Sequence, residues 1–104
     1  MTIIHNKLVR DRIPEIIEAS GKTCATRILP ELEYLAALDA KLQEELNEYQ
    51  EDKSMEELAD LLEVMMAVAK ARGHDFGEVE AIRRAKADKR GGFRERIFLE
   101  SVTE

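Results

Sequence analysis

Two pairs of acidic residues are the part of this sequence best suited to chemistry. Glu45 and Glu48 form one pair, and Glu57 and Asp60 form the other, and the two members of each pair are three positions apart. Residues at this spacing lie on one face of a helix, about 5–6 Å apart, so each pair can present two carboxylates in one direction. If the chain folds back between the pairs, they face each other. Three or four carboxylates around one point form a site for a hard cation.

The same spacing also arises by chance, since the chain has 22 acidic residues. Position distinguishes the two pairs from that background. Glu45 lies at the edge of the apolar stripe of a helix expected over residues 31–51, whereas Glu44 points nearly the opposite way and is expected to be an ordinary surface residue. Glu57 and Asp60 continue an apolar line of the next helix, where buried charges must be paired or bind metal. We therefore expect Glu57 and Asp60, together with Glu45, to bind a metal ion.

Glu57 has a second possible role. Ser54 and Glu57 match the Ser-x-x-Glu pattern of a capping box, in which the glutamate bonds back to the backbone amide of the capping residue. The sequence leaves open whether Glu57 is a cap, a metal ligand or a group that changes between the two roles.

Helices are the elements expected to position these acids. The sequence predicts a short helix at Ile13, Ile16, Ile17 and Ala19, which Gly21 ends, and an extended segment or single strand over 22–29. Long helices are predicted over 31–51, 55–72 and 76–89, with a break over 50–54. Residues 58–69 are apolar nearly all round, more than a monomer of this size can easily cover. We expect an all-α helical bundle completed by oligomerisation, as a homodimer or homotetramer.

Length and composition limit the class of protein. A chain of 104 residues, 44% of them apolar, is expected to form one domain. Its single cysteine, Cys24, excludes an internal disulfide, and no apolar run reaches the length of a membrane span or a signal-peptide core. We therefore expect a cytoplasmic protein with no membrane partner. The net charge of −6 argues against a nucleic-acid binder.

Charge is unevenly distributed along the chain. Residues 44–63 contain nine acids and one base, and residues 83–96 contain seven bases and two acids. Within the basic stretch, Lys86, Lys89 and Arg90 lie about one turn apart at a helix end. They either complement the helix dipole or bind phosphate. The acidic and basic stretches either face solvent separately or share a ligand such as a metal–phosphate complex.

Four segments in order carry a family resemblance. Glu-x-x-Glu is followed by Glu-x-x-Asp within EELADLLEV and then by KADKRGGF, and the chain opens on NKLVRDRIPEII and ends on RGGFRERIFLE. This combination resembles the all-α nucleoside triphosphate pyrophosphatases, a superfamily that includes MazG-like enzymes, dimeric dUTPases and phosphoribosyl-ATP pyrophosphohydrolase. The opening and the tail are similar to a branch of small, stand-alone house-cleaning members.

The resemblance implies one MazG-like domain over 1–104 that uses Mg²⁺, with Mn²⁺ able to substitute, and no other cofactor. The implied reaction is hydrolysis of a canonical or non-canonical nucleoside triphosphate to the monophosphate and pyrophosphate. By position, the implied metal ligands are Glu45, Glu48, Glu57 and Asp60, with Glu45 or Glu48 as general base. The implied phosphate contacts are Lys86, Lys89 and Arg90, and Lys7, Arg10 or Arg12 could also supply positive charge.

Two other function classes remain open. A non-catalytic helical interaction module would have its acidic pairs solvated or paired with the basic tail, without a metal ion. A nucleotide-binding regulator would keep the site and lack turnover.

Overall fold

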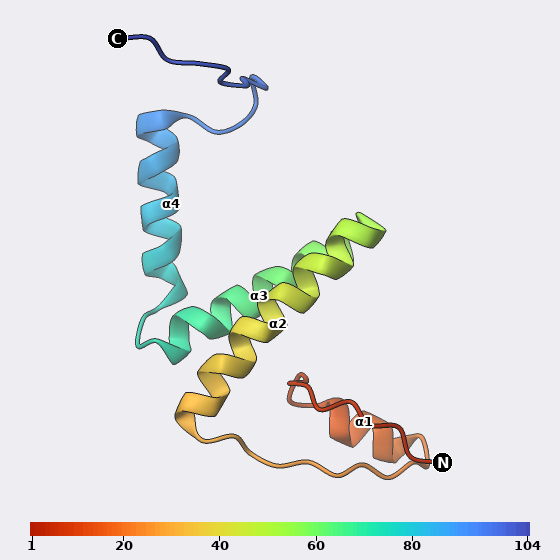
Figure 1. The fold of residues 1–104 in the computed structure, drawn as a ribbon. Coiled ribbons are helices and arrows are strands. Elements are labelled where there is room, and N and C mark those ends of the chain that lie inside the picture. Colours follow the sequence, from red (N-terminus) through yellow and green to blue (C-terminus); the bar gives the residue numbers. More distant parts are fainter.

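In the computed structural model, which describes residues 1–104, all of the regular secondary structure is helical. It contains α1 (Ile13–Ala19), α2 (Glu31–Asp52), α3 (Met55–Ala71) and α4 (Phe76–Arg90), so the predicted all-α class is confirmed. Figure 1 shows α2 and α3 side by side as an antiparallel pair, with α4 leading away from the end of α3. Residues 22–29 connect α1 to α2 without helix or strand, so of the two alternatives for this segment the strand is wrong, because nothing pairs with it. None of the helices qualifies as a membrane span.

The connection between α2 and α3 is very short. Lys53 ends α2 in the left-handed conformation, with φ 58°, and its backbone N–H donates to the carbonyl of Tyr49 at 2.7 Å. Ser54 then caps α3, because its Oγ accepts a hydrogen bond from the backbone N–H of Glu57 at 3.2 Å. Only these two residues separate the helices, fewer than the break expected over 50–54. This tight reversal places the end of α2 against the start of α3.

Local capping also defines α4. The Asp75 side chain accepts a hydrogen bond from the backbone N–H of Gly77 at 3.0 Å and so starts the helix. Gly73 and Gly91, with φ +86° and +83°, flank it in conformations that side-chain-bearing residues rarely adopt. The helix packs against α3 and does not contact α2. The basic residues at its far end are therefore held away from the α2–α3 pair.

The single chain has a very small core. Leu38, Val64 and Ala69 are its buried apolar residues, and Glu45 is buried with them, so only 4 of 104 residues are buried. The radius of gyration is 18.4 Å, against about 13 Å for a compact domain of this length. On α3, Leu58, Leu62, Met65 and Met66 are 38–46% exposed. The apolar helix that the sequence marks as needing a cover is thus uncovered in the isolated chain.

Candidate metal centre

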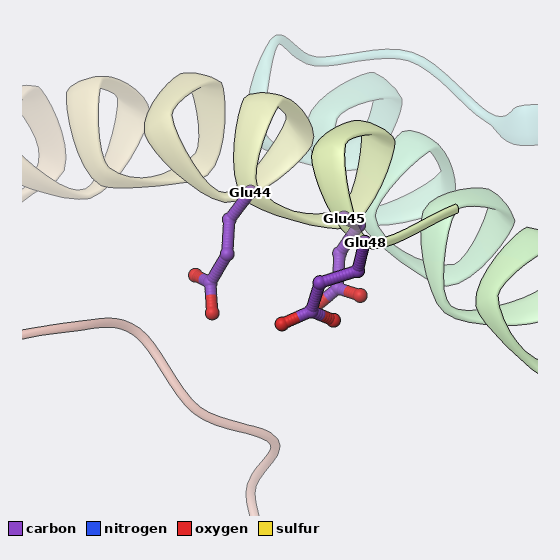
Figure 2. A group of neighbouring side chains, drawn as sticks. All are labelled: Glu44, Glu45 and Glu48. Carbon is purple, nitrogen blue, oxygen red and sulfur yellow. The ribbon is translucent and has the colours of Figure 1, made fainter. Parts of the chain in front are cut away.

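The α2–α3 pair brings the predicted carboxylates together. One oxygen each from Glu45, Glu57 and Asp60 lies within 4.8 Å of the others, across the two helices. A second group within the same limit consists of Glu44, Glu45 and Glu48, all on α2 (Figure 2). Glu45 belongs to both groups. All four sequence-predicted ligands therefore converge on one face, with Glu45 at their centre.

Glu45 is the most buried of these acids. It is 6% exposed, and its Oε1 lies 3.3 Å from the Nζ of Lys41. Its Oε2 is buried without a hydrogen-bond partner. Burial raises the pKa of this carboxyl above its ordinary value, against the opposing effect of Lys41, and the nearby Glu48 raises it further. A buried oxygen with no donor to satisfy it is expected where a cation is to bind.

Glu57 does not complete the capping box. Ser54 accepts from the Glu57 backbone N–H, but the Glu57 carboxylate makes no bond back to Ser54, and its Oε2 is also buried without a partner. Loss of solvent raises the pKa of Glu57 to about 7, and the neighbouring Glu48, Asp52 and Asp60 add to the rise. The carboxylate is therefore free to act as a ligand. An all-oxygen set with two unsatisfied oxygens fits Mg²⁺ or Mn²⁺ well.

The expectation that Glu44 is an ordinary surface residue is wrong. Its carboxylate lies on the same side of α2 as those of Glu45 and Glu48 (Figure 2), and its side chain is only 28% exposed. It pairs with Lys7 at 3.3 Å and with Lys41 at 3.2 Å. The helical wheel placed it outside the apolar stripe correctly, but it could not show that the N-terminal segment passes along this side of α2.

Cations from other parts of the chain surround the acidic centre. The Nη2 of Arg10 lies 2.7 Å from the Oδ1 of Asp60, and its Nη1 lies 3.9 Å from the Oε1 of Glu63. Lys41 was not singled out from the sequence, although its spacing of four from Glu45 is a recognisable helical ion-pair signal. No comparable signal links Lys7 or Arg10 to α2 and α3, because those contacts span 37 and 50 positions.

The basic residues of α4 are not brought to the carboxylates within one chain. Lys86, Lys89 and Arg90 are exposed and form none of the ion pairs in the structure, and the C-terminal end of α4 lies well away from the α2–α3 turn (Figure 1). The surface has two shallow grooves. One lies along α4 near Ala81, and the other lies between α2 and α3 near Leu42 and Leu61. None of the four carboxylates lines either groove.

Comparison with known proteins adds one relative. An uncharacterized protein of Mycolicibacterium smegmatis is 64% identical over 42 residues, which cover 40% of this chain and 43% of that protein. The matched stretch thus spans less than half the length of the relative. No family model matches the chain, and no solved structure matches it. The site must therefore be interpreted from its own geometry.

Proposed function

We propose that this protein hydrolyses a nucleoside triphosphate to the monophosphate and pyrophosphate with Mg²⁺ held by Glu45, Glu48, Glu57 and Asp60. The observation that carries the proposal is the pair of buried, unpartnered oxygens on Glu45 and Glu57 within a group of converging carboxylates. An acidic surface without a ligand function would leave its oxygens in solvent or paired with cations. The reaction class comes from the resemblance of the four sequence segments, and the converging carboxylates support it because the reaction requires ligands for a cation.

The protein groups have separable roles in this reaction. When bound, Mg²⁺ supplies charge neutralisation for the phosphates and favours deprotonation of water. Glu45, Glu57 and Asp60 form the group that joins α2 to α3, and their role is to hold the ion. Glu48 is a member of the group on α2 and not of the group that joins the two helices, so of the four ligands it is the one best placed to take a second role. We assign Glu48 rather than Glu45 as the acceptor of the proton from the attacking water.

Assembly into a homodimer or homotetramer is part of the proposal. A second copy packed on the α3 face around Leu58, Leu62 and Met65 would remove from water the apolar surface that the single chain leaves exposed. Within one chain, α4 keeps Lys86, Lys89 and Arg90 away from the carboxylates, so these residues would contact phosphate at the site of a second copy. Sedimentation at micromolar concentration tests this part, and a compact monomer would contradict it.

A helical interaction module is the alternative, and the C-terminal tail favours it. Phe93 is fully exposed and Phe98 is 87% exposed in a non-helical segment after α4, as expected of a segment that docks on another protein. Such a module would not need the carboxylate cluster. A nucleotide-binding regulator would bind metal and nucleotide and release no product, so product analysis distinguishes it from the enzyme.

The test is a panel of normal and damaged nucleoside triphosphates assayed with Mg²⁺ for pyrophosphate and monophosphate. We expect equal amounts of the two products for at least one substrate, and loss of both with Asp60→Asn. Release of orthophosphate and a diphosphate would contradict the proposed bond cleavage. Turnover that Asp60→Asn leaves intact would contradict the ligand assignment.

A further inference from the structure

Two cations of the N-terminal segment lie directly beside the carboxylate centre. Lys7 reaches Glu44 at 3.3 Å, and Arg10 reaches Asp60 at 2.7 Å. Leu8, between them, is half-buried, which anchors the segment. Figure 2 shows the N-terminal part of the chain, in pale red, passing below the three glutamate side chains, on the side of α2 toward which they point. Positive charge is therefore placed next to the candidate ligands without any contribution from α4.

Their exposure shows that neither cation is locked into its ion pair. The side chain of Lys7 is 44% exposed and that of Arg10 is 55% exposed, whereas Lys41, which pairs with Glu44 and Glu45 on its own helix, is 15% exposed. Exposed ion pairs of this kind contribute little to the stability of the fold. Lys7 or Arg10 can therefore leave its carboxylate partner for a ligand with little loss of stability. Lys41 serves the packing of α2, while Lys7 and Arg10 remain accessible to a ligand.

The pairing of Arg10 couples it to occupation of the site. Its nearest partner is Asp60, which is also a member of the group that joins α2 and α3. A dication shared by these carboxylates takes up the charge that now attracts the guanidinium, and so weakens that ion pair. Arginine has five donors in a planar fork that matches phosphate oxygens in pairs. The guanidinium would then be free to bind phosphate oxygens beside the carboxylates that would hold the ion.

We propose that Lys7 and Arg10 bind the phosphates of the metal-bound substrate in the same chain, with Arg10 transferring from Asp60 to a phosphate oxygen. This inference rests on the proposed function for its substrate class, a nucleoside triphosphate. It distinguishes these two residues from Arg12, which lies in the same segment and forms none of the ion pairs to α2 or α3.

The experiment uses Arg10→Gln and Lys7→Gln, with Arg12→Gln as the matched control that removes one charge from the same segment. Two probes are titrated by calorimetry: Mn²⁺ alone, and inorganic tripolyphosphate in the presence of Mg²⁺. We expect Arg10→Gln to weaken tripolyphosphate binding by about 10- to 100-fold, the size expected for a lost charge-assisted contact. Mn²⁺ should bind this variant as tightly as the parent or more tightly, because a competitor for Asp60 is gone. Arg12→Gln should match the parent with both probes.

The inference would be overturned by tripolyphosphate affinity that Arg10→Gln leaves unchanged, or by an equal loss with Arg12→Gln, which would indicate a general charge effect. Absence of tripolyphosphate binding by the parent would overturn it as well. If circular dichroism shows that Arg10→Gln does not fold, Arg10→Lys replaces it in the experiment. This variant keeps the positive charge but lacks the paired donors of the guanidinium, so it should still lose part of the affinity for tripolyphosphate. A parent that binds both probes but hydrolyses no triphosphate would refute the proposed function and leave this inference standing.

Discussion

Replacing Glu45 with glutamine should separate its role as a ligand from any role in folding. Glu45→Gln removes the charge that both carboxylate groups share and nearly preserves the shape of the side chain. Lys41 keeps a partner, because Glu44 lies 3.2 Å away. The folded-state pKa of Glu45 is raised above its ordinary value of 4.5, so the ionised group opposes folding as pH rises beyond that value. Without metal, the variant should therefore be as stable as the parent or more stable at pH 7, with the difference vanishing below about pH 4.

The effect of metal should be the opposite. For the parent, Mn²⁺ at a hundredfold excess over Kd contributes about 2.7 kcal/mol, which for a domain near 100 residues raises the melting temperature by on the order of 10 °C or more. Loss of a residue that hydrogen-bonds to a metal ligand can weaken metal affinity by roughly 100-fold. Loss of a direct ligand such as Glu45 should weaken Mn²⁺ affinity by at least as much. At the same Mn²⁺ concentration, about 0.4 kcal/mol would remain, a shift of roughly 2–3 °C.

The assay is a thermal melt of parent and variant with EDTA and with Mn²⁺. Glu51→Gln is the control, because Glu51 is an exposed acid of the same helix and forms none of the ion pairs in the structure. It should keep the parental shift. An equal shift in Glu45→Gln would place the ion elsewhere, and a metal-free variant that unfolds would indicate that Glu45 has a structural role.

The remaining predictions concern pH, activity and assembly. Because Glu57 has a pKa of about 7, its proton competes with metal, and Mn²⁺ affinity should fall about 100-fold between pH 8 and pH 5; calorimetry showing a flat profile would contradict this. Glu57→Gln should flatten that profile, and Asp60→Asn should abolish pyrophosphate release while circular dichroism stays parental. Leu62→Glu, on the exposed α3 face, should convert an oligomer to a monomer, as measured by sedimentation. Ile82→Glu, at an exposed apolar position of α4, is the control variant. Calcium should raise the melting temperature but support little turnover, since its coordination is looser.

Much of the fold could be predicted because its signals are local. Ser54 and Asp75 cap the helices that the sequence predicted, and Gly73 and Gly91 follow their ends with positive φ, as glycine commonly does after a helix. The paired acids could be found for a similar reason. A spacing of three on each helix, followed by a tight reversal, leaves few arrangements other than convergence.

The rest of the site depends on contacts between distant segments. Nothing in the local pattern indicates that residues 7–10 run beside α2 and α3, so the pairing of Glu44 with Lys7 and of Asp60 with Arg10 was found only in three dimensions. Glu44 was misjudged for this reason. Of the two alternatives predicted for 22–29, an extended segment or a strand, the strand is wrong, because β-branched residues form a strand only where a neighbouring strand is present to pair.

Anomalous scattering from a crystal of the protein grown or soaked with millimolar Mn²⁺ tests the central claim most directly. We predict a manganese peak within coordination distance of Glu45, Glu57 and Asp60, with Arg10 displaced from Asp60 when a non-hydrolysable triphosphate is also present. The absence of manganese from these three carboxylates, or its presence only at other surface acids, would contradict the claim that this cluster is a catalytic metal centre.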